Sequence, residues 1–488
     1  MQVRPLVATW RPLSPATRIT TAAPAERVSL RHGTAIAPAG SRLLPARRPS
    51  AAAASHGAGD AAAEHYDVVI IGSGPVGSAF ARKLVAGGQH VCMVDAGPRT
   101  SSKPGAHLKN AYKYQRDVNK FADHIRGALQ TLSVPTNFAS VPTLDPLAFN
   151  PPPTAKGYVR GNQNPYQSQQ DNLPAAAATY NVGGMGTHWT CSCPRPTEIE
   201  RNWLFPSDEA YSEAENILRV NQKAFLNYSI RDRTLNSRAF VVHLYCTCSL
   251  YRSSARPGGP APERRGDIVA REFEPFCRHD LSVDPVPIPI DDADPNQWIP
   301  VSPERPWHAQ VHRDAFAYGD APPNVDSRLI VDLRFFGIVS QRFENHVEFH
   351  TCASKGVTDM MGLPQPTFHY KYTAEEKLLM HNMMEDMCYY ASKVGGYLPG
   401  SEPQFMKPGL SLHIHGSTRV GDSPEDSVVG RTGRVHGTKN LFLGGNGLIP
   451  RAIACNPTLT SVAYALQASE FILRNSSSSG ASRPERLA

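Results

Sequence analysis

The sequence predicts an α/β fold, with a Rossmann-like domain assembled from both termini and an α+β domain inserted between the two parts. Residues 66–97 read YDVVIIGSGPVGSAFARKLVAGGQHVCMVDAG: an apolar strand, a glycine-rich turn, a helix and a second apolar strand. Near the other end, Asn440–Leu443 has the pattern of a short strand, Gly444-Gly445 follow, and a helix is expected from Pro457. One nucleotide-binding fold interrupted by a long insertion accounts for glycine-rich turns at both ends.

The turn after the first strand has the G-x-G-x-x-G spacing of a dinucleotide-binding site. Gly72 permits the tight turn, Gly74 lets a pyrophosphate approach the backbone, and Gly77 lets the following helix lie close to the strand. Asp95 ends the second strand about twenty residues later, where a ribose hydroxyl needs an acceptor. A turn that merely packs tightly would not account for this acid. The sequence therefore predicts a dinucleotide site made of Gly72, Ser73, Gly74, Pro75, Gly77 and Asp95.

Composition limits the classes of partner. The chain has 488 residues and a formal net charge of +7, and its mean hydropathy is −0.35. The first sixty residues contain eight arginines and two acidic residues, so the remainder is close to neutral and gives no reason to expect nucleic acid. No apolar run approaches the roughly 18 residues of a membrane helix. Nine scattered cysteines do not form a disulfide framework.

Five segments are expected along the chain. Residues 1–65 are rich in Ala, Pro, Arg and Ser and are expected to be disordered; an organelle transit peptide and a non-native upstream extension explain them equally well. The first residues show no apolar run of the length expected in a secretory signal, so we expect none and make no prediction of the compartment. Residues 66–230 are expected to form the first part of the nucleotide domain, 231–400 the substrate domain, 401–474 the rest of the nucleotide domain, and 475–488 a disordered tail.

Residues 183–191, GGMGTHWTC, form a second unusual stretch. Three glycines in four positions demand special backbone angles or close approach to a flat ligand. His188 follows at once, and its neutral imidazole is a nucleophile that a glycine-rich turn could bring to such a ligand. The alternative is a buried histidine that is hydrogen-bonded to the backbone.

Near the C-terminus, residues 412–421 carry His413 and His415, and Asn456-Pro457 precede the last predicted helix as N-cap and N1. Imidazole titrates near neutral pH, so either histidine is a candidate base for the proton of a hydroxyl group. Asn456 can hold a substrate oxygen without changing charge. Either histidine could instead be structural, and Asn456 could be a plain helix cap.

The middle of the chain contributes structural elements. We expect a strand at Arg328–Phe336 and an amphipathic helix at Ala374–Val394. His308 and His312 have H-x-x-x-H spacing, but no helix is signalled and no third ligand is near, so no metal site is expected.

Together these stretches resemble the glucose–methanol–choline (GMC) flavoenzymes and, within them, the pyranose 2-oxidase subfamily. The resemblance implies FAD, oxidation of an aldopyranose such as D-glucose at C2 to a 2-keto sugar, reduction of dioxygen to hydrogen peroxide, and a homotetramer. It rests on segments that span most of the chain after residue 65: Gly72–Gly77, Gly184–Cys191, Pro306–Gly319, Asp326–Gly337 and Asn440–Thr460.

The resemblance also implies roles for individual residues. His413 and Asn456 match the catalytic pair, and His188 matches a histidine bonded covalently to the flavin. Residues 314–319 match a mobile substrate loop. The alternative interpretation of these residues is a surface turn. The matched flavin-binding positions are Thr187, His188, Trp189, Thr190, Cys191, Gly445, Asn446, Pro457 and Thr458, and the matched substrate positions are Gln310, Asp314, Phe316, Tyr318 and Arg334.

One region departs from the subfamily pattern. Between about residues 231 and 280 the family has a much longer insert, including a further strand of the flavin domain, and no equivalent is found here. A parallel sheet that lacks a strand exposes apolar edges, so stability and activity are in question. The alternatives to a C2 sugar oxidase are a decayed, non-catalytic flavoprotein and a relative that oxidises C3 or a glycoside or passes electrons to quinones.

Overall fold

The computed structural model describes most of the chain after residue 64. The described residues are 65–101, 103–107, 129–132, 164–221, 280, 282–284, 286, 296–312, 326, 330–359, 362–394, 397, 402–406 and 408–478. The chain divides into two units, Met1–Ala63 and Glu64–Ala488. All described residues belong to the second unit, so the expectations for the first 64 residues and for the tail after residue 478 lie outside them.

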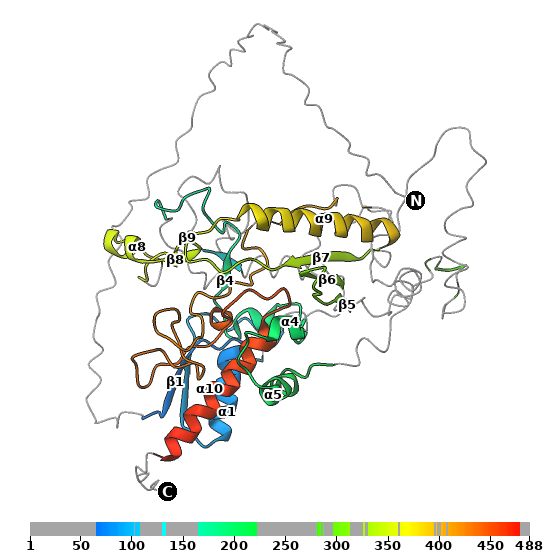
Figure 1. Cartoon of the computed structure of the whole chain (residues 1–488). Coiled ribbons are helices and arrows are strands. Elements are labelled where there is room, and N and C mark those ends of the chain that lie inside the picture. The colour runs from blue at the N-terminus through cyan, green and yellow to red at the C-terminus, as the bar shows by residue number, and fades with distance from the viewer. Residues whose placement is uncertain are drawn as a thin grey trace, which may run out of the picture. The chain divides into compact units, whose positions relative to one another are not determined.

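The described elements are, in chain order, β1 (Val68–Ile71), α1 (Pro75–Ala86), β2 (Val91–Val94), β3 (Leu129–Thr131), β4 (Ala177–Thr179), the 3₁₀ helix η3 (Gly184–Thr187), α4 (Glu198–Arg201), α5 (Asp208–Leu218), β5 (Asn296–Ile299), β6 (Trp307–His312), β7 (Asp332–Gly337), β8 (His346–Glu348), α8 (His350–Lys355), β9 (Thr367–His369), α9 (Ala374–Val394), the 3₁₀ helix η6 (Asn446–Leu448) and α10 (Thr458–Ser478). Figure 1 shows their arrangement.

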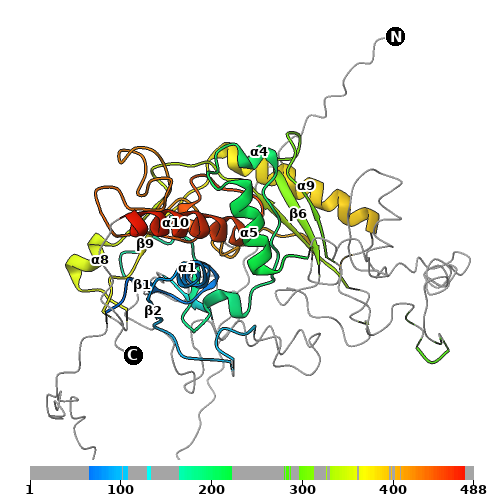
Figure 2. The ribbon, with the colours of Figure 1, turned by 90° about the horizontal axis from the view of Figure 1, so that it is seen from below.

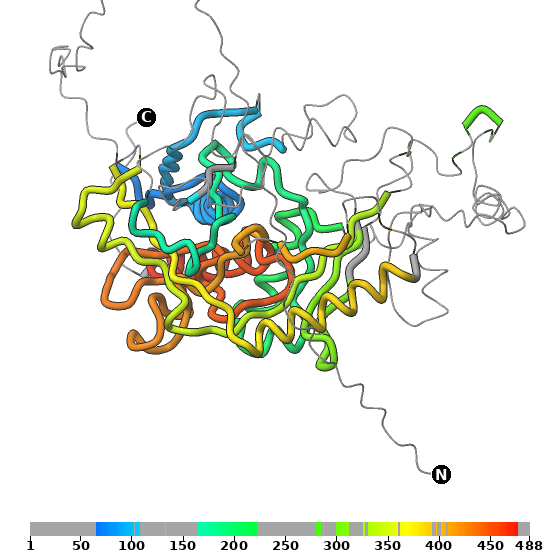
Figure 3. The backbone as a smooth tube through the Cα atoms, turned by 90° about the horizontal axis from the view of Figure 1, so that it is seen from above, coloured from blue at the N-terminus to red at the C-terminus, as the bar shows by residue number. Residues whose placement is uncertain are grey.

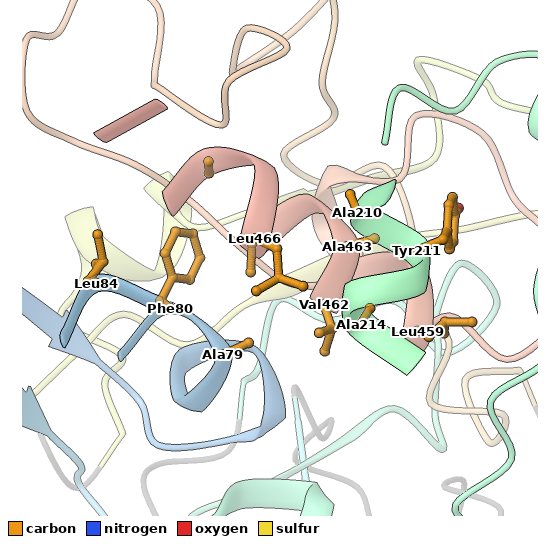
Figure 4. Packing of buried hydrophobic residues seen from close by; sticks show 12 residues of the cluster. Ala79, Phe80, Leu84, Ala210, Tyr211, Ala214, Leu459, Val462, Ala463 and Leu466 are labelled. Atoms are coloured by element: carbon orange, nitrogen blue, oxygen red, sulfur yellow. The ribbon is translucent and has the colours of Figure 1, made fainter. Parts of the chain in front are cut away.

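The two ends of the described chain share one hydrophobic core. β1 and β2 pair in parallel, with Val68 opposite Val91, and α1 connects them. The C-terminal helix α10 lies against both α1 and α5 (Figures 2 and 3). Figure 4 shows Phe80 and Leu84 of α1 packed with Val462 and Leu466 of α10. The prediction of a Rossmann-like domain built from both termini is confirmed.

The inserted part contains the antiparallel sheet β5–β6–β7, backed by α9 (Figure 1). Val311, Leu333 and Phe335 point to one face of the sheet and pack against Tyr390 of α9. The helix has the bounds that the sequence predicts. β7 begins at Asp332, later than the predicted strand at Arg328.

Two C-terminal expectations need correction. Asn440–Leu443 is not a strand, because Phe442 forms only an isolated bridge with Arg434. The last helix begins at Thr458, and the carbonyl of Pro457 accepts its first bond, from the N–H of Ser461 at 2.9 Å. Asn456 therefore lies one residue before the cap position.

One face of the small parallel sheet has exposed apolar side chains in the described part of the chain. Among the described strands, β1 and β2 pair only with each other. Val69, Ile71 and Val94 are 59%, 89% and 50% exposed, although a parallel sheet is ordinarily covered on both faces. Within the described residues, no helix has both the length and the apolar character needed to cross a bilayer.

Candidate active site

The glycine-rich turn between β1 and α1 leaves room for a ligand. Gly72 has φ +94°, a left-handed angle that suits glycine, and a Cβ atom placed there would meet nothing within 4 Å. A Cβ atom at Gly77 would lie 2.0 Å from the carbonyl oxygen of Gly72. The helix can approach the turn this closely only because residue 77 has no side chain. Gly74 caps α1, and Pro75 opens it.

Asp95 lies at the end of β2 and joins this turn. Its Oδ2 accepts bonds from the backbone N–H of Ser73 at 2.9 Å and from Ser73 Oγ at 2.6 Å, and its Oδ1 accepts from Gly97 N–H at 2.9 Å. Burial raises the pKa of Asp95, but these bonds outweigh burial and hold the pKa below its ordinary value. The carboxylate is therefore ionised at neutral pH and retains acceptor capacity for a ribose hydroxyl.

The glycines at 183–186 pack directly on the turn of β1 and α1. Gly183 N–H donates to Ser73 Oγ at 2.8 Å. A Cβ atom at Gly184 would lie 3.2 Å from the Cα of Gly74, and one at Gly186 would lie 2.7 Å from Pro75 Cγ. The two glycine-rich stretches, more than a hundred residues apart in sequence, thus form one continuous surface.

His188 follows this second turn and is 1% exposed. Its Nε2 lies 2.8 Å from Thr179 Oγ1 at the end of β4. Thr187 is fully buried; its hydroxyl donates to the carbonyl of Gly184 at 2.9 Å and accepts from Asn181 Nδ2 at 3.0 Å. These bonds hold the histidine backbone in place beside the glycine surface.

The residues after His188 turn outward. Trp189 is half-buried, and its carbonyl lies 2.8 Å from His107 Nε2. Thr190 and Cys191 are exposed, and Cys191 has the left-handed φ of 60°. The matched flavin-binding stretch therefore has buried residues at its start and exposed residues at its end.

The segment at 444–446 reaches the same helix from the C-terminal side. A Cβ atom at Gly444 would lie 2.8 Å from both Val76 Cγ1 and Phe80 Cε2 of α1. Gly445 has φ +103° and open space where a Cβ atom would stand. Asn446 Oδ1 accepts a bond from Ser461 Oγ at 2.7 Å, which ties η6 to α10.

Asn456 meets the inserted sheet. It is 9% exposed, and its Oδ1 accepts a hydrogen bond from Gln310 Nε2 of β6. The same amide nitrogen lies 3.4 Å from Ser192 Oγ, just beyond the stretch that follows His188. Gln310 thus connects the strand of the inserted sheet, the start of α10 and the His188 loop. Pro457 follows Asn456 at the cap position, and the helix begins at Thr458.

One face of β6 and β7 carries the polar residues. Gln310 pairs with Arg334, and His308 pairs with Phe336, so all four side chains point away from α9. Phe336 stacks on His308 at 5.0 Å between ring centroids and on His413 at 5.6 Å. His415 stacks on the other side of His413 at 6.3 Å. The sheet therefore brings Arg334, Gln310, His413 and Asn456 to one region.

A cavity of about 1150 Å³ adjoins this region. His413, His415, Arg334 and Phe336 line it, together with methionines of α9. Its volume exceeds that of a monosaccharide and lies slightly above the range of about 300–1,000 Å³ that is usual for ligand pockets. Among the described residues, no group of three His, Cys, Asp or Glu side chains is arranged to hold a metal ion.

Some predicted residues lie outside the described part of the chain, and one important residue was missed. Asp314, Phe316 and Tyr318, with the whole substrate loop 314–319, belong to the residues that the structure does not describe. Glu200 was not predicted, although it is fully buried and bonds to the backbone just before Asn456. The sequence signal for it is the capping-box pair of Thr197 and Glu200.

The site has the features that a dinucleotide needs. A Cβ atom at Gly72 or at Gly445 would meet nothing within 4 Å, and Asp95 is an ionised hydrogen-bond acceptor at the end of β2. Glycines in three separate stretches make a surface that side chains would otherwise fill.

We expect stability to fall with acid. Burial lowers the pKa of His413 to about 4, and burial and then His413 lower that of His415 to about 3, from 6.5. Between pH 6.5 and these values the unfolded chain binds protons that the folded chain does not. This contribution to the free energy of unfolding is therefore complete above about pH 6.5 and is lost as the pH falls toward 4 and 3.

Urea unfolding between about pH 7.5 and 4.5 measures this effect. The variant His415→Phe should flatten the pH dependence, whereas replacement of the exposed His381 by Asn should leave it unchanged. Equal slopes for the wild type and His415→Phe would contradict the prediction.

Comparison with known proteins gives close relatives. The chain is 32% identical to pyranose 2-oxidase of Emericella nidulans, covering 84% of this chain and 92% of the relative, and 33% identical to pyranose 2-oxidase of Tricholoma matsutake, covering 84% and 94%. It is 27% identical to a C-glycoside 3-oxidase of Arthrobacter globiformis, covering 83% and 94%. A family model described as GMC oxidoreductase matches residues 351–465.

The chain belongs to the GMC oxidoreductase family. It is an oxidoreductase homologous to the pyranose 2-oxidases, and FAD is the cofactor that membership of the GMC family implies. The α/β fold and the family resemblance predicted from the sequence are both confirmed.

This GMC oxidoreductase is shorter than its relatives in the aligned part. The alignment with the Emericella nidulans protein spans 564 positions, whereas 84% of 488 residues is about 410, so about 150 positions have no counterpart in this chain. The comparison therefore agrees with the expectation of missing sequence, without locating it at residues 231–280.

Proposed function

We propose that this GMC oxidoreductase oxidises the C2 hydroxyl of an aldopyranose such as D-glucose, using FAD, and reduces dioxygen to hydrogen peroxide. The supporting observation is the hydrogen bond between Gln310 and Asn456. It joins a predicted substrate residue to a predicted catalytic residue, 146 positions apart. Arg334 of β7 and His413 both line the cavity, and Arg334 pairs across the sheet with Gln310 of β6.

The roles of the residues follow from their chemistry. His413 has a pKa lowered to about 4 by burial, so its imidazole is neutral at working pH and takes the hydroxyl proton as a base. Asn456 holds the substrate oxygen through its amide, and Gln310 fixes the orientation of that amide. FAD, when bound at the glycine surface, supplies the acceptor for the hydride that leaves the same carbon.

The proposal is tested with the purified protein. D-glucose should give hydrogen peroxide in air, and analysis of the product should find the carbonyl at C2. A carbonyl at C3 would show that the protein is a 3-oxidase, and turnover only with an added quinone would show that it passes electrons to quinones. Either result would contradict the proposal. The C-glycoside 3-oxidase relatives favour testing glycosides in the same assay.

We expect FAD to remain attached after denaturation. His188 is buried beside the glycine surface, where the resemblance assigns covalent attachment. After acid precipitation, the yellow colour of the wild type should stay with the protein. His188→Ala should release its flavin, while His107→Ala, which removes another imidazole beside the same loop, should retain it. Release of flavin from the wild type would contradict the assignment.

A second candidate function is that of a flavoprotein without turnover. The roughly 150 missing positions and the exposed apolar side chains of β1 and β2 favour it. Bound FAD without peroxide release on any aldopyranose would support this candidate. Light scattering after size exclusion tests the homotetramer that the subfamily resemblance implies.

A further inference from the structure

We propose that Glu200 is a positioning residue for Asn456. Its carboxylate would fix the backbone turn that presents the Asn456 amide to Gln310 and to the substrate. The inference rests on the proposed function, because it concerns the same reaction, but it concerns a residue on a different element, the short helix α4.

The carboxylate of Glu200 is fully buried and accepts four hydrogen bonds. Its Oε2 accepts from the N–H of Thr197 at 3.0 Å and from Thr197 Oγ1 at 3.1 Å, which completes the capping box of α4. Its Oε1 accepts from the N–H groups of Ala454 at 2.8 Å and Cys455 at 3.3 Å. One side chain thus ties α4 to a turn more than 250 residues later.

The turn before α10 is buried, and Cys455 also packs in a hydrophobic cluster with Ile453 and Tyr464. Ala454 is 1% exposed and Cys455 is fully buried, so water does not replace the carboxylate as acceptor. Asn456 follows immediately, and its Oδ1 must face Gln310 to accept the bond that it makes. A change in the backbone at residues 455 and 456 would move the Cα atom of Asn456, and with it the amide that faces β6.

The stretch that carries α4 also reaches the site from the other side. Ser192, five residues before Thr197, lies 3.4 Å from the same Gln310 nitrogen that donates to Asn456. Glu200 therefore closes a ring of contacts through α4, the turn before α10 and β6. A displacement of about 1 Å in such a ring can cost roughly a hundredfold in rate.

Glu376 provides a matched control. It is 4% exposed and makes the same kind of contacts: Oε2 accepts from the N–H of Thr373 at 2.8 Å, and Oε1 accepts from a distant backbone N–H, that of Ser340, at 2.6 Å. It differs from Glu200 in lying on α9, away from the turn before α10, and in having Arg342 Nη2 at 3.7 Å from its Oε2. Replacement of either acid by glutamine removes one acceptor oxygen from a buried carboxylate.

The experiment compares Glu200→Gln with Glu376→Gln in the full chain loaded with FAD. Both variants should lower the melting temperature by a similar amount. Glu200→Gln should slow flavin reduction by D-glucose roughly ten- to hundredfold, and Glu376→Gln should stay within about twofold of the wild type. Equal rates for the two variants would overturn the proposal.

A double variant tests whether Glu200 acts through Asn456. If it does, Glu200→Gln with Asn456→Ala should be no slower than Asn456→Ala alone. Additive losses would overturn the proposal, because they would show that Glu200 acts independently of this amide.

Amide hydrogen exchange gives a readout that does not need turnover. Glu200→Gln should speed exchange in a peptide that covers residues 452–458, and Glu376→Gln should not. If Glu200→Gln does not fold, Glu200→Asp serves instead, because the shorter side chain keeps the charge but cannot reach both sets of donors. Unchanged exchange in Glu200→Gln would overturn the proposal. If the wild type is inactive on every sugar but Glu200→Gln still exchanges faster, only the proposed function is overturned.

Discussion

Replacement of His413 by alanine is expected to lower the rate of flavin reduction by a sugar about 10²- to 10⁴-fold, the usual loss when a general base is removed. His413 is the residue of the cavity that is stacked on Phe336 and neutral at working pH. Binding of FAD should be unaffected, because the glycine surface and Asp95 are formed by other segments. Anaerobic stopped-flow absorbance measures the reduction directly, apart from the reaction with oxygen.

His415 is the rival base and the matched control. It lines the same cavity, and burial also lowers its pKa, to about 3. The family resemblance assigns the role of base to His413. His415→Ala should therefore lose much less activity than His413→Ala. The reverse order of losses would transfer the role of base to His415, and near-normal reduction in both variants would end the assignment.

Replacement of Gly77 by alanine is expected to abolish FAD binding. The added Cβ atom would lie 2.0 Å from the carbonyl oxygen of Gly72, so α1 must move away from the turn. Overpacking of this kind costs about 1–3 kcal/mol or more in the free energy of unfolding. It also displaces Gly74 and the start of α1, where the pyrophosphate is expected to bind. Flavin absorbance per protein after desalting measures the loss.

Gly430→Ala is the control for this prediction. A Cβ atom at Gly430 has its nearest neighbour at 3.7 Å, which is ordinary contact, and its φ lies outside the left-handed range. This variant should bind FAD like the wild type. A Gly77→Ala protein that retains full flavin content would show that the close approach of α1 to the turn is not needed for binding.

Local patterns in the sequence were enough for the dinucleotide turn and for α9. In the first, glycine spacing and two apolar strands specify a unit whose contacts lie within about thirty residues. In the second, amphipathic periodicity over 21 residues specifies a helix with the bounds observed. Both elements are determined mainly by contacts between residues that lie close together in the sequence.

Contacts between distant segments were not open to the same reasoning. The apolar run at Asn440–Leu443 looks like a strand, but a strand needs a partner, and only Phe442 bridges to a neighbour. The family resemblance assigned Gln310 and Asn456 to substrate and catalytic roles, but no pattern in the sequence predicted the hydrogen bond between them. Glu200 was missed because an acidic residue in a short helix is ordinarily exposed, and its four donors come from two separate segments.

The exposed apolar face of β1 and β2 has a practical consequence for anyone who purifies the protein. Val69, Ile71 and Val94 form an exposed apolar patch. Two molecules can remove this patch from water by associating through it. Concentrated stocks should therefore become turbid sooner than dilute ones, and a mild detergent should clear them. Association through this patch will therefore limit the concentration at which the protein can be purified.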